Sequence, residues 1–442
     1  MKKNYLYLIL GSLLLGSLVM TACSKGEAEI SGTYSAYLQG NDWGENISQI
    51  TLELDQQLDA NTISVDDFTI SETKEMFNWL QPDKGVSEMT NPRTILSAYS
   101  SAKDGNQTDD SSQYVTLEFS TGPNDGRYYL YSPEAIFSQY PKFYKLDIKL
   151  SDKSDLTSDG KKVSSLNIDS EIKNLNHSAQ QFNLDKYTAS DGVEYQYAEF
   201  TPENSNDVLV VWLHGLLEGG SQNTDPYITL LGNEAANLAS EEFQKTIGGA
   251  HILVPQSPSF WMDKTGKDEL INGGIESDGS SFYTNSLHEL IQSYKEEIGA
   301  KKVVIVGASN GGYMGMNMAR EYGAEYDAYM LLAEAMENRF ITDEDIQKLK
   351  DLPLYFVYST KDPLVIPEEY EIPTIERLTA AGAKNLQEAV LSDVLDTSGN
   401  IKGEEGKPYD FGGHSVWVPF FNNEVISSSG ISAWEWIAEQ LK

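Results

Sequence analysis

Apolar and polar residues alternate in short runs along the first third of the chain. In the run 47–54, Ile50, Leu52 and Leu54 would share one face of an extended strand, while the residues between them are polar. Asn, Asp, Gly and Pro separate further runs of this kind, which cover residues 67–71, 94–99, 114–120 and 143–150. Several short strands with turn signals between them predict an antiparallel β sandwich over residues 31–151.

The hydrophobic pattern changes near residue 182, where continuous apolar runs replace the alternation. Such runs are typical of strands buried on both faces of a parallel sheet; they cover residues 208–213, 252–254, 303–306, 329–332 and 354–358. Helical stretches are predicted between or after them at 284–298, 311–321 and 432–441. Residues 182–442 are therefore predicted to form an α/β domain with a doubly wound, mostly parallel sheet. The polar composition of the segment 152–181 predicts a connector between the two domains.

The first 22 residues have the pattern of an export signal. Lys2 and Lys3 precede an apolar stretch that ends at the small residues Thr21 and Ala22. Residues 20–23 resemble the lipobox of bacterial lipoproteins, which implies that Cys23 is lipidated after removal of residues 1–22. Residues 23–30 would then be a lipidated tether, and the protein would be anchored in the membrane at the bacterial cell surface. An ordinary secretory signal with a coincidental cysteine is the alternative.

Composition narrows the possible functions. The 442-residue chain has 32 Lys and Arg against 67 Asp and Glu, a formal net charge of −35. This balance argues against nucleic acid as a partner, because phosphate contacts need clustered basic residues. With one cysteine, the chain cannot form an intramolecular disulfide or a multi-thiolate zinc site. We expect no metal, no cofactor and a small-molecule substrate.

Ser309 is the candidate nucleophile. It lies in the pattern Gly-x-Ser-x-Gly, directly after the apolar run 303–306 and directly before a helical stretch. This order is required for a nucleophile elbow, in which a sharp turn between strand and helix exposes the serine hydroxyl. The flanking Gly307 and Gly311 would leave room for that turn.

A serine nucleophile needs a general base and a carboxylate that orients the base. His414 is the one histidine that follows Ser309, and it lies in a glycine-flanked segment near the C-terminus. Asp362 follows the apolar run 354–358, at the strand end where catalytic groups gather in open α/β sheets. Asp393 and Asp396, after the next apolar stretch, are the competing acids.

Two backbone N–H groups are expected to bind the developing oxyanion. One belongs to Asn310, directly after the nucleophile, and the other to Leu216, with Leu217 as the second choice. His214, which precedes this loop, is predicted to be structural. Trp261, Met262 and Leu217 could line the substrate pocket. Trp261 and Met262 would fit the hydrophobic core equally well. The segment 263–281 fits either a flap over the pocket or a plain surface loop.

These motifs together resemble the α/β-hydrolase superfamily. The matching residues are Val211–Gly215, Gly307–Gly312, Asp362-Pro363 and Gly413-His414, and the closest resemblance is to prolyl-oligopeptidase-like esterases. The strands before them resemble the immunoglobulin-like N-terminal domain of EstA-type bacterial esterases. The resemblance implies a smaller all-β immunoglobulin-like sandwich followed by an α/β-hydrolase domain, with Ser309 as nucleophile, Asp362 as acid and His414 as base. The loop after Gly215 is bulkier here than in the Gly- or Ala-rich versions.

Three functions remain open at this stage. The leading hypothesis is a surface-anchored serine hydrolase that cleaves carboxylic esters through an acyl-enzyme. A serine peptidase of the prolyl-oligopeptidase type is the second, although the N-terminal segment lacks the repeats of the β-propeller that such enzymes carry. A non-catalytic binding or adhesion lipoprotein that uses the β domain is the third.

Overall fold

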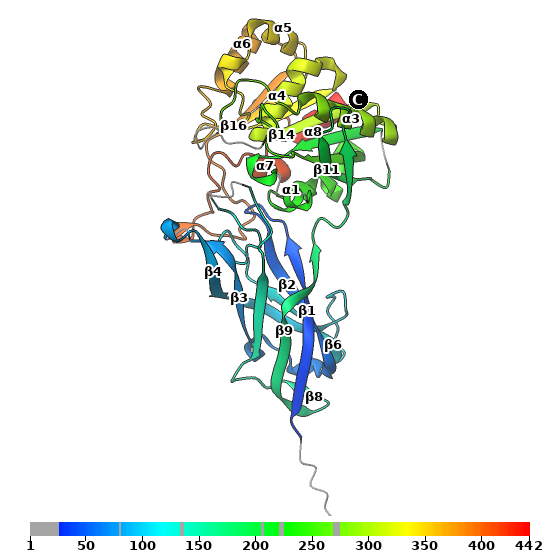
Figure 1. The fold of residues 1–442 in the computed structure, drawn as a ribbon, viewed down its shortest axis with the longest axis vertical. Coiled ribbons are helices and arrows are strands. Elements are labelled where there is room, and N and C mark those ends of the chain that lie inside the picture. Colours follow the sequence, from blue (N-terminus) through cyan, green and yellow to red (C-terminus); the bar gives the residue numbers. More distant parts are fainter. Residues whose placement is uncertain (1–25, 79–80, 133–136, 205–206, 221–224, 268–274) are drawn as a thin grey trace, which may run out of the picture.

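The chain folds into two domains that follow each other in sequence (Figure 1). The computed structural model describes residues 26–78, 81–132, 137–204, 207–220, 225–267 and 275–442. The proposed signal peptide and Cys23 lie outside these residues. Within the described residues, we find no helix with the length and apolar character needed to cross a membrane.

The N-terminal domain is a β sandwich of the immunoglobulin-like type, as predicted. Its strands pair in the order β4-β3-β7-β9-β1-β2-β6-β5, and β8 pairs with β9. Ile50, Leu52 and Leu54 are buried, so the alternation in the sequence is an alternation between core and surface. The strands are β1 (Ala28–Gln39), β2 (Asn46–Leu58), β3 (Phe68–Phe77), β4 (Val86–Pro92), β5 (Ile95–Ser101), β6 (Ser112–Phe119), β7 (Tyr144–Leu150), β8 (Thr157–Ser158) and β9 (Lys161–His177).

The segment 152–181 is not a connector, and this prediction is wrong. Most of it forms β9, a 17-residue strand that runs parallel to β1 and also touches β7 through the pair Lys145–Glu171. The sequence pattern does not predict β9, because the pairing of this strand with β1 contains several register shifts. These shifts break the strict alternation of apolar and polar positions. Val163 and Leu166 are buried, whereas most of the other side chains are polar and at least partly exposed.

The C-terminal domain contains a second sheet of eight strands in the order β10-β11-β13-β12-β14-β15-β16-β17. From β13 to β17 all neighbours pair in parallel, whereas β11 pairs antiparallel with both β10 and β13, which confirms the doubly wound, mostly parallel sheet. The strands are β10 (Asn183–Thr188), β11 (Glu194–Phe200), β12 (Val208–Leu213), β13 (Ala250–Gln256), β14 (Lys302–Ala308), β15 (Ala328–Leu332), β16 (Leu354–Ser359) and β17 (Leu386–Leu391).

Helices cover both faces of this sheet. Every residue of β12, β13, β15 and β16 is buried, as continuous apolar runs require in a sheet covered on both sides. The three predicted helices appear as α3, α4 and α8, with ends within two residues of the prediction. The helices are α1 (Tyr227–Leu231), α2 (Glu241–Ile247), α3 (Thr284–Ile298), α4 (Asn310–Tyr322), α5 (Asp343–Leu349), α6 (Glu371–Ala380), α7 (Trp417–Phe421) and α8 (Ala433–Gln440).

The two domains pack directly against each other. One apolar cluster continues from the β sandwich into the face of the second sheet that carries Trp212. Polar contacts reinforce the junction: the Asn422 amide donates to the carboxylate of Asp42 at 3.0 Å, and the Tyr140 hydroxyl donates to Asp225 at 2.9 Å. The β domain is thereby held at the edge of the α/β domain where the candidate site lies.

Candidate active site

Ser309 stands on a strained turn between β14 and α4. Its backbone angles are φ 54° and ψ −113°, a conformation that residues other than glycine rarely adopt. The flanking glycines are required by close approach: a Cβ on Gly311 would lie 2.0 Å from the carbonyl oxygen of Leu213, and one on Gly307 would lie 2.3 Å from the carbonyl oxygen of Gly311. These backbone contacts hold the serine hydroxyl at the carboxyl edge of the sheet.

His414 connects Ser309 to Asp362 through two hydrogen bonds. Its Nε2 lies 3.0 Å from Ser309 Oγ, and its Nδ1 lies 2.7 Å from Asp362 Oδ2. The other carboxylate oxygen of Asp362 accepts hydrogen bonds from the N–H groups of Leu364 and Val365 at 2.8 and 3.0 Å. The buried carboxylate is thus fixed by its own loop and directed at the imidazole.

The competing acids are occupied elsewhere. Asp393 forms an ion pair with Lys361 at 2.5 Å. Asp396 accepts hydrogen bonds from the hydroxyl of Ser398 and the N–H of Gly399 at 2.6 and 2.9 Å. The structure therefore brings Asp362, and neither competitor, to His414.

The two expected oxyanion donors, Asn310 and Leu216, line the same cavity as Ser309. Asn310 is the first residue of α4, where a helix leaves its backbone N–H groups without partners inside the helix. Leu216 begins a single 3-10 turn, Leu216–Glu218, and lines the same cavity as Ser309. Their role as oxyanion donors stays a prediction.

His214 stabilises the loop that contains Gly215 and Leu216. Its Nε2 accepts the N–H of Ser257 at 2.9 Å, so its Nδ1 carries the proton and donates to the carbonyl oxygen of Gly215 at 2.6 Å. Burial lowers the pKa of His214 to about 4, so the ring is neutral at physiological pH. Its geometry is that of a structural residue.

Trp261 does not line the pocket, contrary to the prediction. Its side chain is fully buried and packs against the rings of His214 and Tyr195, while its backbone N–H donates to Asn310 Oδ1 at 2.6 Å. The chain turns inward after β13, so the tryptophan supports the site from the core side. Leu217 and Met262 do line the cavity, and the Leu217 side chain is 44% exposed.

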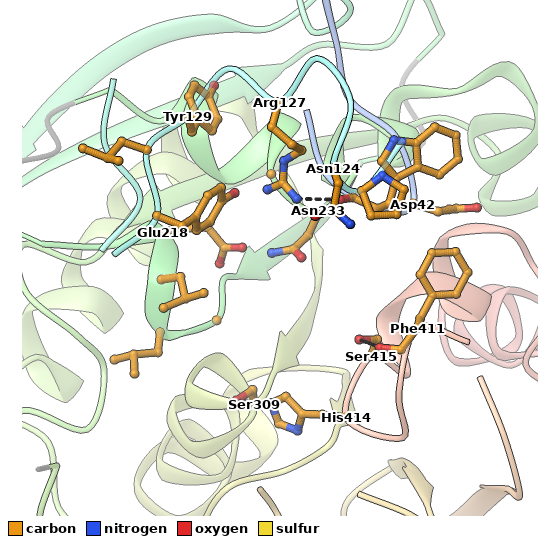
Figure 2. A pocket seen from close by; sticks show the side chains of 18 of the residues that line it. Asp42, Asn124, Arg127, Tyr129, Glu218, Asn233, Ser309, Phe411, His414 and Ser415 are labelled. Atoms are coloured by element: carbon orange, nitrogen blue, oxygen red, sulfur yellow. Dashed lines mark hydrogen bonds between the residues drawn. The ribbon is translucent and has the colours of Figure 1, made fainter. Parts of the chain in front are cut away.

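A cavity of about 880 Å³ opens above Ser309, and both domains line it (Figure 2). We call it the interdomain cavity. The β domain supplies one wall, which includes Trp43, Arg127, Tyr129 and Tyr131. The α/β domain supplies the other wall, and its aromatic members are Tyr370, Tyr409, Phe411 and Trp417.

The sequence pattern did not point to the β-domain wall. These residues lie in loops, between β1 and β2 and between β6 and β7, where no periodicity marks a functional side chain. The one available signal was the density of aromatic residues at Tyr128–Tyr131. Tyr128 and Tyr129 belong to a cluster of rings in which Tyr129 and Tyr140 lie edge to face at 5.2 Å.

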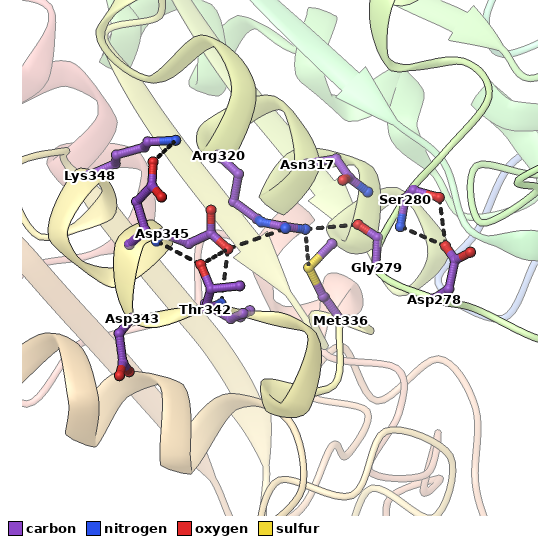
Figure 3. A network of polar contacts seen from close by, with 12 residues as sticks. Asp278, Gly279, Ser280, Asn317, Arg320, Met336, Thr342, Asp343, Asp345 and Lys348 are labelled. Atoms are coloured by element: carbon purple, nitrogen blue, oxygen red, sulfur yellow. Dashed lines mark hydrogen bonds and ion pairs between the residues drawn. The ribbon is translucent and has the colours of Figure 1, made fainter.

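Arg320, on α4, links the segment 263–281 and the loop after β15 to the helix that directly follows Ser309 (Figure 3). Its guanidinium donates to the carbonyl oxygen of Gly279 at 2.8 Å and pairs with Asp345 at 3.2 Å. The Tyr313 hydroxyl donates to the carbonyl oxygen of Ser280 at 2.7 Å. The segment 263–281, for which a flap and a plain surface loop were equally expected, is therefore fixed at this end, and residues 268–274 lie outside the described residues.

Two buried glutamates lie behind Asp362, and no pattern in the sequence marks them. Glu334 and Glu371 are fully buried, and three of their four carboxyl oxygens have no hydrogen-bond partner. Burial, reinforced by the nearby Asp362 carboxylate, raises the pKa of Glu371 to about 8. Burial and the neighbouring Glu371 also raise the pKa of Glu334. Glu371 is therefore mostly protonated at neutral pH.

Replacing Glu371 by glutamine is expected to make the protein less sensitive to alkaline unfolding. Folded Glu371 keeps its proton to about pH 8, whereas in the unfolded chain it loses it near 4.5, so the free energy of unfolding falls as pH rises through this window. Glutamine cannot ionise. Between pH 5.5 and 9, urea unfolding should show the Glu371→Gln variant losing about 3 kcal/mol less stability than the parent, at about 1.4 kcal/mol per pKa unit. The exposed Glu368→Gln is the control; parallel losses in all three proteins would contradict the assignment.

Comparison with known proteins agrees with this architecture. The family model described as the esterase Ig-like N-terminal domain matches residues 33–165. A solved structure described as a thermostable esterase is similar over 88% of this chain and 96% of its own, with 18% identity and a TM-score of 0.64. No curated protein matches the chain.

Two further solved structures overlap with about half of the chain. A carboxyl esterase from Bacillus coagulans covers 48% of this chain and 89% of its own, with 12% identity and a TM-score of 0.34. LpqC, a poly(3-hydroxybutyrate) depolymerase from Bordetella parapertussis, covers 48% and 86%, with 14% identity and a TM-score of 0.33. The family match and the shared fold of the thermostable esterase confirm the resemblance: the chain has the immunoglobulin-like N-terminal domain of EstA-type esterases, joined to an α/β-hydrolase fold.

Proposed function

We propose that this protein is a serine hydrolase that cleaves carboxylic esters through an acyl-enzyme. The observation that carries the proposal is the hydrogen-bonded series Ser309–His414–Asp362, which opens onto the interdomain cavity. A serine, a histidine and a buried carboxylate in this order form the arrangement that activates a hydroxyl for attack on an acyl carbon. The fold shared with a thermostable esterase supports the same reaction class.

In the first half of the reaction, Ser309 Oγ attacks the ester carbonyl while His414 Nε2 takes the hydroxyl proton. The carbonyl oxygen gains negative charge and is stabilised by the N–H groups of Asn310 and Leu216. Asp362 holds the imidazole in the tautomer that presents Nε2 to the serine, and it stabilises the imidazolium that forms. His414 then returns the proton to the alcohol oxygen as the C–O bond breaks, and the alcohol leaves.

In the second half, water replaces the alcohol. His414 takes a proton from the water, whose oxygen attacks the acyl carbon of the acyl-enzyme. The second tetrahedral intermediate collapses, His414 protonates Ser309 Oγ, and the carboxylic acid is released. The five groups named here, Ser309, His414, Asp362 and the N–H groups of Asn310 and Leu216, would complete the cycle without a cofactor.

The other two hypotheses receive less support. Peptidases of the prolyl-oligopeptidase type restrict access with a β-propeller, whereas the N-terminal domain here is a sandwich. A purely binding protein would not need Ser309 in a strained backbone conformation, which costs free energy and is retained at functional sites. A panel of short-chain p-nitrophenyl esters and proline-containing peptides separates ester from peptide hydrolysis, and labelling by a fluorophosphonate separates both from binding alone.

We also propose that the protein is exported and anchored at the bacterial cell surface by a lipid on Cys23. The lipobox-like sequence Met20–Cys23 supports the anchor, and β1 begins only five residues later, at Ala28. The Cys23→Ser variant is expected to leave the membrane fraction of fractionated cells. Equal retention of the variant and the parent in the membrane would contradict lipid anchoring.

A further inference from the structure

The interdomain cavity has a polar end that the proposed reaction does not use. In Figure 2, Arg127, Glu218 and Asn233 point toward one another on one side of the cavity, and Ser309 and His414 lie on the opposite side. Arg127 comes from the β domain, whereas the other two residues come from the α/β domain. We call these three residues the polar subsite.

Hydrogen bonds fix the side chain of Arg127, and the carboxylate of Glu45 neutralises its charge. Its guanidinium makes two hydrogen bonds of 3.3 Å to the carboxylate of Glu45, which is fully buried, and donates to the carbonyl oxygen of Trp43 at 2.9 Å. Its flat face lies 4.6 Å from the centre of the Tyr131 ring. Among partners in the described residues, these bonds use three of the five N–H donors of the Arg127 guanidinium. A rigid, neutralised donor group therefore remains for a ligand.

Glu218 supplies the second polar group. Its side chain is 95% buried, it lines the cavity, and its Oε2 has no hydrogen-bond partner. His214 Nδ1 lies 3.7 Å away but already gives its proton to Gly215, so it does not satisfy this oxygen. Burial raises the pKa of Glu218 to about 8. The neutral carboxylic acid can both donate and accept a hydrogen bond, as a hydroxyl ligand requires.

The rest of the β-domain wall favours a neutral ligand. Lys74 and Arg93 are buried and both pair with Glu72, at 2.8 and 3.0 Å, so neither offers a free charge to an anion. The guanidinium of Arg127 disfavours a cationic ligand at the same place. Aromatic side chains line the same wall, and Trp43, which is partly exposed, can stack on the face of a ring.

We propose that the polar subsite binds a neutral, hydroxyl-rich ring of the sugar type, carried by the ester whose carbonyl Ser309 attacks. Arg127 would donate to ring or hydroxyl oxygens, and Glu218 and Asn233 would each exchange hydrogen bonds with neighbouring hydroxyl groups. The cavity volume of about 880 Å³ is in the upper range for pockets that enclose a whole small molecule. This assignment rests on the proposed ester hydrolysis and adds the class of substrate to it.

The test compares esters that share a butyryl group and differ in the alcohol. The sugar esters are the 6-O-butyryl esters of methyl glucoside and methyl galactoside; butyl butyrate is the plain ester, butyrylcholine the cationic one and O-butyryl glycolate the anionic one. The parent enzyme is expected to show a kcat/KM at least tenfold higher for one of the sugar esters than for butyl butyrate. A preference for the plain, cationic or anionic ester would overturn the assignment.

Variants then locate the preference in the polar subsite. Asn233→Ala and Glu218→Leu are expected to lower the ratio of sugar-ester to butyl-butyrate kcat/KM at least fivefold, mainly through KM, while Glu218→Gln keeps most of it. Equal losses on both esters would mean that these residues only support the catalytic loop, and would overturn the proposal.

If the parent cleaves none of the esters, the proposed function fails, and the subsite is then tested by binding alone. Calorimetric titration of the parent and of Asn233→Ala with methyl glucoside and methyl galactoside then shows whether the polar subsite binds a sugar. Binding weakened by the variant supports the subsite, and absence of binding to the parent overturns it.

Discussion

Replacing Ser309 by alanine is expected to lower kcat for p-nitrophenyl butyrate by a factor of about 10⁴ to 10⁶. The change removes the only atom that can form the acyl-enzyme and leaves His414 and the oxyanion donors in place. The strained backbone at residue 309 should persist, because it is imposed by the approach of Gly311 to Leu213. Steady-state kinetics, with circular dichroism to verify the fold, measures the effect.

A second serine in the same cavity provides the control. Ser415 follows His414, but its hydroxyl donates to the carbonyl oxygen of Phe411 at 3.0 Å and is not linked to the imidazole. Ser415→Ala is expected to change kcat by less than about fivefold, within the usual effect of losing one neutral hydrogen bond. Retained turnover and fluorophosphonate labelling in Ser309→Ala would rule out Ser309 as the nucleophile and, with it, the proposed mechanism.

The variant Asp362→Asn is expected to lower kcat by a factor of about 10⁴ while the fold is kept. The N–H groups of Leu364 and Val365 bond one carboxylate oxygen and would hold the asparagine oxygen in its place. The amide nitrogen would then face His414 Nδ1 as a donor. The imidazole would have to present an acceptor there, so its Nε2 would carry the proton and could not take one from Ser309.

The variant Asp393→Asn tests whether another nearby aspartate contributes to catalysis. This residue pairs with Lys361, the neighbour of Asp362 in sequence, and does not reach His414. Its kcat is expected to stay within about twofold of the parent, because an exposed ion pair contributes little. A large loss in Asp393→Asn with little loss in Asp362→Asn would reverse the assignment of the acid.

The residues nearest the reaction could be predicted because each is tied to a local pattern. Ser309 lies between two glycines that the turn requires, Asp362 ends a buried strand, and His414 is the one histidine after the serine. These patterns report backbone constraints, and such constraints act over a few residues. The hydrogen bonds that connect the three positions agree with the predicted roles.

The cavity walls could not be predicted, because they are made by contacts between residues far apart in sequence. Arg127 reaches its place through Glu45, which is 82 residues away, and the cavity exists only because the β domain packs against the α/β domain. Trp261 shows that a residue predicted to line the cavity can instead be buried in the core. Its position shortly after a strand suits a pocket residue, but the direction in which the chain turns decides that it is buried.

The long strands of the β domain would also set the distance between the proposed active site and the proposed lipid anchor. β1 begins at Ala28 at the end of the sandwich remote from the α/β domain and runs for 12 residues toward it (Figure 1). At about 3.3 Å per residue, this strand spans about 40 Å. For a protein held by a lipid on Cys23, that span is a stand-off distance. Such an enzyme would act on molecules that pass well above the bilayer, and the lipids of its own membrane would lie beyond its reach.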